Sequence, residues 1–318
     1  MKRRTFIAGL GSAAAWPVVV RAQQAAIPVI GFLSLGPNGP NRLGASFYQG
    51  LKEAGYVEGQ NVTILYFGGR GLDRLRELAT ELVRRQVSVI LTTNDGPAVA
   101  AKRATSTIPI VFFNIGSDPK TLGLVDSINR PGGNVTGASL DSPQIAAKQL
   151  ELLCQLVPTA ETVAYLSNGP TLLSFEEVKN ALVAAAERAR RQLVFVECRS
   201  NDGLGAAFAT IVERGAGAIM AGTLFGVSGD AVLSLASQYK IPVSGATQGA
   251  LMNYTSDFAD QTRIAAALVG QILKGAMPAD LPVRRSLKFH FVINLKTAKA
   301  LGLTIPEALV AAADEVIE

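Results

Sequence analysis

Histidine, cysteine and tryptophan are nearly absent from this chain of 318 residues, which contains one, two and one of them respectively. His290 is the sole histidine, so a Ser-His-Asp or Cys-His catalytic site would have to use it. The sequence also lacks the G-x-S-x-G, H-E-x-x-H and P-loop patterns of common hydrolases, zinc proteases and nucleotide-binding enzymes. These absences argue against an enzyme with a familiar active site, and no metal or cofactor is expected.

The two cysteines are far apart, Cys154 in a predicted helix and Cys198 at a predicted strand end. No CxxC or Cys/His spacing surrounds them, so they do not indicate a metal site. A disulfide between them is possible in an oxidising compartment. Two buried free thiols are the state that we expect.

Charged residues make up only 17% of the chain and aromatic residues only 6%, whereas hydrophobic residues make up 48%. This balance is typical of a globular protein with large buried cores. The abundance of Ala, Val, Leu and Gly suits parallel sheets packed against Ala-rich helices. The length allows two domains, at the usual size of roughly 100–200 residues each.

The first 22 residues have the pattern of an export signal that is removed from the mature protein. Lys2-Arg3-Arg4 form a basic start, Thr5–Val20 an apolar run, and Val20-Arg21-Ala22 a small-residue cleavage pattern. The segment Arg3–Ile7 resembles the twin-arginine export signal, with an ordinary Sec signal as the alternative. A membrane anchor is disfavoured, because the apolar run is shorter than the roughly 20 residues that a span needs.

The net charge of +5 does not indicate a nucleic-acid partner. Four of the 30 basic residues, Lys2, Arg3, Arg4 and Arg21, lie in the export segment, which carries no acid. The remaining chain has 26 basic residues against 25 acidic ones. A nearly neutral protein presents no electrostatic footprint for nucleic acid or for an anionic membrane.

Strand-like apolar runs alternate with helix-length segments along almost the whole chain after residue 27. Ile27–Leu35 and Val87–Thr92 are predicted strands, and Leu72–Arg85 is a predicted amphipathic helix between them in the chain. Parallel strands need such helical crossovers. The pattern therefore predicts an α/β fold with two doubly wound parallel-sheet lobes.

Two stretches rich in Gly, Pro, Asn, Asp and Ser interrupt the alternation, at residues 114–139 and 245–257. Each is interpreted as a passage of the chain between the lobes, which makes both lobes discontinuous and favours a hinge over a loose linker. The predicted N-terminal lobe comprises residues 27–135 and 249–280, and the C-terminal lobe residues 138–246 and 285–318.

Polar and small residues recur at the carboxyl ends of the predicted strands, the edge at which open α/β sheets bind ligands. Asn94–Gly96 is predicted to hold a ligand carboxylate through backbone amides and a helix N-terminus, and Asp118 to hold a ligand ammonium. The alternative is that each residue only caps its own helix. The predicted ligand-binding residues are Ser34, Asn38, Thr93, Asn94, Asp95, Gly96, Asn114, Ser117, Asp118, Asn168, Thr223, Phe225 and Thr247.

Six segments together resemble a known family: IPVIGFLSL, GLKEAGYVEGQNV, IPIVF, DPKTLGLVDSINRPGGNVTG, ILKGAMPADLPV and INLKTAKALGLTIP. They are similar to bacterial solute-binding proteins of ATP-binding-cassette transporters, in the subgroup related to tryptophan, tyrosine or other aromatic-amino-acid binders. The resemblance implies a type 1 periplasmic binding fold, in which two α/β lobes joined by a three-strand hinge close on a small molecule. It places the third crossover near Ala279–Arg285.

The resemblance also implies a monomeric periplasmic protein that is not an enzyme and that delivers its ligand to the permease subunits of the transporter. One position departs from the family pattern, since Gly96-Pro97 stands where a Thr commonly precedes the Pro. Backbone amides with Thr93 or Asn94 would have to replace that hydroxyl.

An aromatic ligand would find possible ring contacts in Phe47, Tyr48, Phe225 and Tyr254. Other functions stay open at this point. One is a periplasmic ligand-sensing protein that feeds a signalling partner, and another is an enzyme on the same fold. An effector domain of a lac-repressor-type regulator is disfavoured, because such a chain would begin with a helix-turn-helix.

Overall fold

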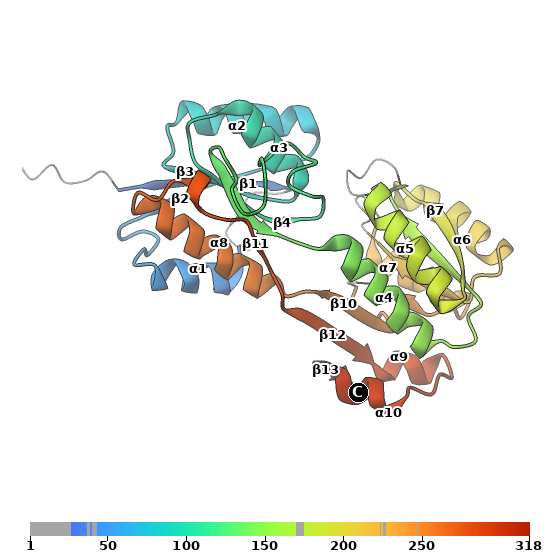
Figure 1. Ribbon diagram of the computed structural model, residues 1–318. Helices are drawn as coiled ribbons and strands as arrows, with labels where there is room; N and C mark the ends of the chain where they lie inside the picture. Colours follow the sequence, from blue (N-terminus) through green and yellow to red (C-terminus); the bar gives the residue numbers. More distant parts are fainter. Residues whose placement is uncertain are drawn as a thin grey trace, which may run out of the picture.

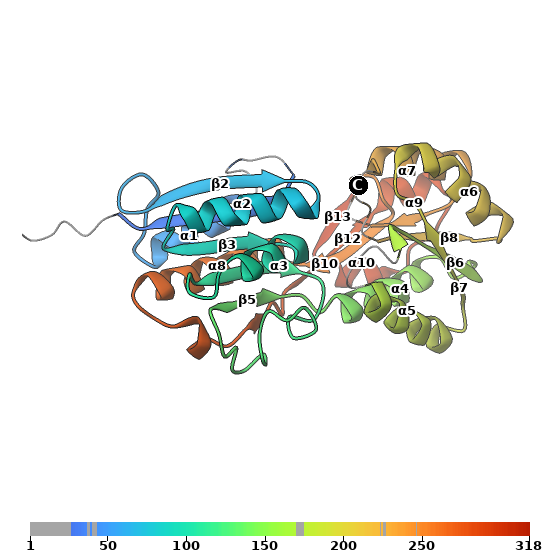
Figure 2. The same ribbon diagram turned by 90° about the horizontal axis from the view of Figure 1, so that it is seen from above.

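The computed structural model describes residues 27–36, 39, 43–169, 175–222, 224, 227–245 and 247–318. They form two α/β lobes that lie side by side, each built on one twisted sheet with helices packed against it (Figure 1 and Figure 2). The expected α/β class with two parallel-sheet lobes is confirmed. The predicted export signal at residues 1–22 lies outside the described part. Within that part, no helix combines the length and apolar character that crossing a bilayer requires.

The first lobe contains a six-stranded sheet in the order β11-β5-β4-β3-β1-β2, with all neighbouring strands parallel. Every residue of β3 and of β5 is buried, as expected for strands covered on both faces. The elements of this lobe are β1 (Val29–Leu35), α1 (Gly44–Glu53), β2 (Thr63–Gly69), α2 (Leu72–Arg84), β3 (Val89–Thr93), α3 (Asp95–Ala104), β4 (Ile110–Ile115), β5 (Val135–Ser139), α8 (Phe258–Leu273) and β11 (Arg284–Arg285).

Alternate residues of these strands fill two separate cores, one on each face of the first sheet. Phe32 and Phe113 pack with α1 and α8 on one face. Leu33 and Phe112 pack with α2 and α3 on the other. Because side chains alternate across a strand, a continuous apolar run such as that of β1 supplies both cores at once.

The second lobe contains a seven-stranded sheet in the order β13-β12-β10-β9-β8-β6-β7. Its strands are parallel except where β10 meets β12. Its elements are α4 (Ser142–Leu156), β6 (Thr162–Ser167), α5 (Phe175–Ala189), β7 (Gln192–Glu197), α6 (Leu204–Glu213), β8 (Ala218–Ala221), α7 (Gly229–Gln238), β9 (Val243–Ser244), β10 (Met252–Ser256), β12 (Phe289–Asn294), α9 (Leu295–Ala300), α10 (Glu307–Ala312) and β13 (Glu315–Ile317).

The chain passes between the two sheets three times, after β5, after β10 and after β11 (Figure 1). The second passage differs from the expected boundary at residue 249. Strand β10 pairs with β9 and, over five residue pairs, with β12, so it belongs to the second sheet. The polar composition of this segment suggested a passage, but the backbone of β10 finds its hydrogen-bond partners in the second lobe. The chain therefore crosses at Asp257, and α8 packs in the first lobe.

Asp257 caps α8 at this crossing. Its carboxylate accepts hydrogen bonds from the backbone N–H groups of Ala259 at 2.8 Å and Asp260 at 3.2 Å. These N–H groups have no partner within the helix, so the cap satisfies them. At the other end α8 stops before Gly275, whose φ of 100° is one that glycine adopts without strain.

Replacing Asp257 with Ala is expected to lower the free energy of unfolding by about 1 kcal/mol, because both backbone donors lose their acceptor. Urea unfolding followed by far-UV circular dichroism measures the change. Asp230→Ala is the matched control, since α7 is capped by Ser228 instead. A shift for Asp230→Ala as large as that for Asp257→Ala would contradict the capping role.

The two cysteines and the histidine lie away from the cavity between the lobes. Cys154 and Cys198 are both buried and unbonded, as expected. Burial raises the pKa of each thiol, which keeps both protonated at neutral pH. The Nε2 atom of His290 on β12 lies 3.8 Å from a carboxylate oxygen of Glu315 on β13. Neither thiol nor the imidazole lines the cavity described below.

Candidate functional site

A cavity of about 570 Å³ lies between the two lobes. This volume is within the range of small-molecule sites. Residues from the carboxyl ends of strands in both sheets form its walls, together with residues of α2, α3, α4 and α5. The lining comprises Leu35, Leu72, Asn94, Asp95, Gly96, Asn114, Gly116, Leu140, Ser142, Ile145, Ala146, Gln149, Tyr165, Phe175, Val178, Met220, Ala221, Gly222, Gly245, Asn253, Tyr254 and Thr255.

The first-lobe wall combines polar residues with Leu35 and Leu72, and its backbone is strained at two positions. Asn94, between β3 and α3, has φ 68° and ψ 164°, and Asn114 on β4 has φ 54°. Residues other than glycine rarely adopt such backbone conformations, although asparagine adopts them more readily than most. The turn at Asn94 brings the start of α3 to the cavity. The first N–H groups of a helix have no partner within it, and Asp95 and Gly96, the first two residues of α3, are among the lining residues.

The carboxylate of Asp95 joins the loops that follow β3 and β4. Its Oδ2 atom accepts a hydrogen bond from the hydroxyl of Ser117 at 2.6 Å. Its Oδ1 atom accepts from the backbone N–H of Gly116 at 2.9 Å. Bonds to an ionised acceptor are stronger than neutral ones, so they hold the two neighbouring loops in one arrangement. Asp95 as a whole is half-buried and is one of the residues that line the cavity.

The second-lobe wall is largely apolar and aromatic. Tyr165 and Phe175 both pack edge-on against Phe195, with ring centroids 5.9 Å and 6.2 Å away respectively. Phe195 on β7 thus supports two rings of the cavity wall. Burial raises the pKa of Tyr165 to about 12, so its hydroxyl remains a protonated donor at neutral pH. Within this wall, the amide of Gln149 donates to the hydroxyl of Ser244 at 2.6 Å.

The electrostatic character of the cavity follows from its lining. Asp95 is the single carboxylate among the described lining residues, and they include no Lys, Arg or His. A ligand with a net negative charge would find no side-chain cation among them. A ligand carboxylate would depend on backbone N–H groups at the start of α3, whereas a ligand cation can approach Asp95. The lining therefore suits a neutral, zwitterionic or cationic molecule with an apolar part.

The structure brings four of the predicted site residues together in this cavity: Asn94, Asp95, Gly96 and Asn114. Four others are buried close to strand ends but do not line it, namely Ser34, Thr93, Ser117 and Asn168. Thr247 lines a separate, smaller cavity of about 140 Å³ in the second lobe. Asn38, Thr223 and Phe225 lie outside the described residues.

Asp118 does not line the cavity, although the sequence suggested an ammonium contact there. It is exposed, and its carboxylate accepts hydrogen bonds from the N–H of Lys120 at 3.1 Å and the hydroxyl of Thr121 at 3.3 Å. This carboxylate is therefore engaged by its own turn. Asp95 is the carboxylate at the cavity instead.

Most aromatic residues of the second-lobe wall were not identified as cavity residues from the sequence. Tyr254 was noted and does line the cavity, whereas Phe47 is fully buried in the first core and Tyr48 hydrogen-bonds Tyr66 at 2.8 Å. Tyr165 lies within a fully buried strand. Its sequence context is that of an ordinary core residue. Phe175 could have been identified from the sequence, because it begins a helix that follows a strand end.

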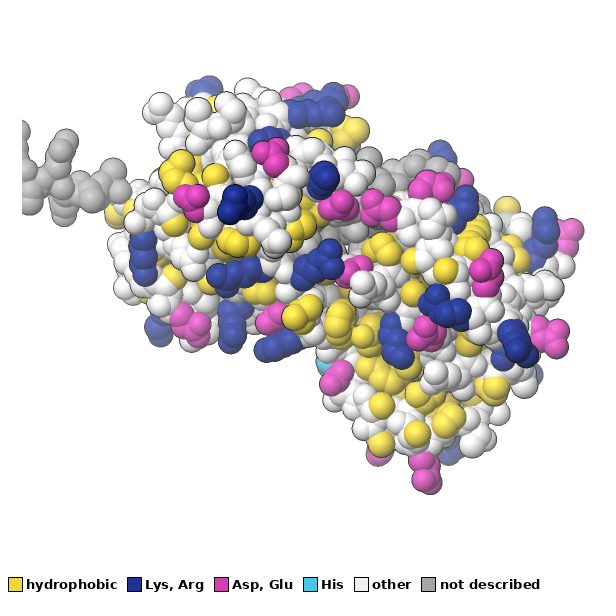
Figure 3. Space-filling model, viewed as in Figure 1, with side chains coloured by type: hydrophobic (Ala, Val, Ile, Leu, Met, Phe, Trp, Pro, Cys, Tyr) yellow, Lys and Arg dark blue, Asp and Glu magenta, His cyan; other side chains and the backbone are white. Residues whose placement is uncertain are grey.

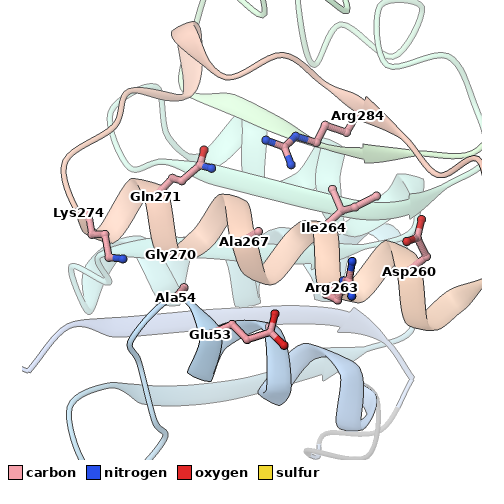
Figure 4. Close-up of a pocket in the computed structure, with 11 residues that line it drawn as sticks. Glu53, Ala54, Asp260, Arg263, Ile264, Ala267, Gly270, Gln271, Lys274 and Arg284 are labelled. Carbon is pink, nitrogen blue, oxygen red and sulfur yellow. The ribbon is translucent and has the colours of Figure 1, made fainter.

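A second cavity, of about 450 Å³, lies on the outside of the first lobe between α1, α8 and β11 (Figure 4). Ala267 and Gly270 lie between charged residues, among them the cations Arg263, Lys274 and Arg284. Figure 3 shows Lys and Arg side chains spread over this face of the first lobe. All its lining residues belong to one lobe, so closing of the two lobes does not enclose it. Among the described residues, no group of His, Cys, Asp or Glu is arranged to hold a metal.

Comparison with known proteins agrees with this two-lobed arrangement. Residues 38–317 match the family model described as ABC transporter substrate binding protein. The chain is 27% identical over 264 residues to the tyrosine-binding protein of Clostridioides difficile strain R20291, covering 81% of this chain and 75% of that protein.

Solved structures show the same fold. A conserved domain protein from Vibrio cholerae is 26% identical with a TM-score of 0.77, covering 91% of this chain and 99% of that one. An ABC domain from Streptococcus pneumoniae in complex with L-Trp is 24% identical, with the same TM-score and the same coverage of both chains. The type 1 periplasmic binding fold is therefore confirmed.

Proposed function

Since the chain belongs to the ABC transporter substrate-binding protein family, we propose that it captures a small molecule between its lobes and delivers it to a membrane permease. The observation that carries this proposal is the composition of the cavity of about 570 Å³. The first lobe supplies a carboxylate, two asparagines and two leucines, and the second lobe supplies mainly apolar and aromatic side chains. A molecule that satisfies both walls has a polar end and an apolar end.

Two walls on different lobes explain how binding is coupled to closing. A ligand in the cavity contacts both lobes fully only when they are closed, so its affinity for the closed state is higher. The three passages between the sheets provide the hinge. Closing then presents a permease with a surface that differs from that of the empty protein.

The ligand class is an amino acid with an aromatic or large apolar side chain. Its ammonium would lie near Asp95, its carboxylate near the first N–H groups of α3, and its side chain against Tyr165, Phe175 and Tyr254. The relatives support this class, since one is a tyrosine-binding protein and another was crystallised with L-Trp.

The place of action follows from the first 22 residues together with the family. An export signal, of the twin-arginine or the Sec type, would bring the mature protein to the periplasm, where substrate-binding proteins meet their transporters. A ligand-sensing protein that reports to a signalling partner would use the same cavity. Transport is favoured over sensing and over an enzyme because the family match covers residues 38–317.

A screen for thermal stabilisation of the purified mature protein tests this function. We expect L-tyrosine or L-tryptophan to stabilise it, by about 2.7 kcal/mol at ~100 times the dissociation constant. Two analogues act as matched controls for charge. Tyramine lacks the carboxylate, and 3-(4-hydroxyphenyl)propionate lacks the ammonium.

The charge of the lining predicts the order of these analogues. Because the described lining has a carboxylate and no cation, tyramine should bind better than 3-(4-hydroxyphenyl)propionate. Tight binding of the anion alone would contradict the proposed ligand class. The absence of any shift across a broad library of amino acids, sugars and nucleosides would count against solute capture itself.

A further inference from the structure

A phenyl ring at the junction of the lobes belongs to none of the hydrophobic cores. Phe289 is the first residue of β12 and is 38% exposed. It follows the third passage, which contains Leu287, exposed by 78%. Exposed apolar side chains occur singly on most proteins and need no explanation by themselves. The position of Phe289, however, is fixed by a contact with the cavity wall.

That contact is with Tyr254, which lines the cavity between the lobes. The rings of Phe289 and Tyr254 are stacked, with centroids 5.4 Å apart and an angle of 16° between the ring planes. Phe291 meets the same tyrosine from another direction, at 6.3 Å and 66°. Tyr254 is paired with Phe291 across the antiparallel strands, so Phe289 is its diagonal neighbour. The tyrosine ring is therefore held by two phenyl rings of β12.

The stacked pair stands at the base of two passages between the lobes. Tyr254 lies three residues before the crossing at Asp257, and Phe289 directly follows the third passage. The backbone N–H of Asp257 donates to the carbonyl of Lys288 at 2.8 Å, which joins the two passages side by side. When a hinge turns, backbone dihedral angles change at such positions. Without support, a ring this close to the hinge would change orientation as the lobes close.

We propose that Phe289 is a positioning residue that holds the ring of Tyr254 in the cavity wall while the neighbouring hinge segments move. The ring then remains part of the second lobe in open and closed states alike. A flat apolar group of the ligand meets a wall that is already ordered, so ordering this wall costs no binding free energy. This role deepens the proposed function and rests on it as far as the ligand is concerned.

The test compares Phe289→Ala with the matched control Phe258→Ala in the full mature chain. Phe258 is also a partly exposed phenylalanine beside a passage, but its ring packs edge-on against Phe113 of the first lobe. Stacked aromatic pairs contribute enough to change an equilibrium about 3- to 10-fold. Phe289→Ala is therefore expected to weaken L-tyrosine binding about 3- to 10-fold in calorimetry, and Phe258→Ala to leave it unchanged. Phe289→Tyr should retain the wild-type affinity, since it keeps an aromatic ring at this position.

A second measurement needs no ligand. Amide hydrogen exchange of residues 252–256 in the empty protein should become about 3- to 10-fold faster in Phe289→Ala and stay unchanged in Phe258→Ala. If the wild-type protein binds no amino acid, the proposed function fails while hydrogen exchange still decides the positioning role. Unchanged exchange in β10 would overturn the inference. Unchanged L-tyrosine affinity in Phe289→Ala, with wild-type binding present, would overturn it as well.

Discussion

Replacing Asp95 with Ala is expected to weaken the binding of an amino-acid ligand by about 100-fold, because it removes the single carboxylate of the described cavity lining. The substitution also takes away the acceptor of the Ser117 hydroxyl and the Gly116 N–H. The loops after β3 and β4 then lose the bonds that hold them together. Titration calorimetry with L-tyrosine measures the loss.

Two further variants separate charge from position. Asp95→Asn keeps an oxygen acceptor for Gly116 but loses the charge, so it should fall between the wild type and Asp95→Ala. Asp118→Ala is the matched control, because this exposed carboxylate bonds only its own turn. A large loss for Asp118→Ala with no loss for Asp95→Ala would reverse the assignment and restore the interpretation drawn from the sequence.

Replacing Gly137 with Ala is expected to lower the free energy of unfolding of the first lobe by about 3 kcal/mol. A Cβ atom at this position would lie 2.2 Å from the backbone carbonyl oxygen of Phe112, in the neighbouring strand β4. A side chain could turn away, but a paired backbone cannot move without losing ladder hydrogen bonds. Urea unfolding measures the change.

Gly205→Ala is the control for this effect. Gly205 lies in α6, and no heavy atom lies within 4 Å of the position of an added Cβ. Alanine is the better helix former, so this variant should be more stable by roughly 0.5 kcal/mol. A similar destabilisation in both variants would mean that the contact with Phe112 is not the cause.

The parts of the site that could be read from the sequence are those set by chain position. Asn94, Asp95 and Gly96 follow a buried strand and begin a helix, and the carboxyl ends of parallel strands share one edge of a sheet. Asn114 was found by the same argument. To predict these positions, only the order of strands and helices must be known. The hydrophobic pattern of the sequence indicates that order.

Other parts of the site depended on side-chain direction and on strand pairing, which the hydrophobic pattern of the sequence does not encode. Asp118 stands only three residues beyond a strand end, yet a local turn binds its carboxylate. Tyr165 occupies a fully buried strand, and its place at the cavity depends on where the second lobe faces the first. The strand β10 shows the same limit, because its polar composition suggested a passage and its pairing partners decided otherwise.

The sequence by itself thus determined the α/β class, the two lobes, the family and the polar residues Asn94, Asp95 and Asn114 of the cavity lining. Alternating apolar runs and strand-end residues are local features, so they can be recognised from the sequence alone. Only the tertiary structure decided the aromatic wall and the contact between Phe289 and Tyr254. Each of these depends on two segments distant in the chain, whose meeting is set by sheet pairing and by the packing of one lobe beside the other.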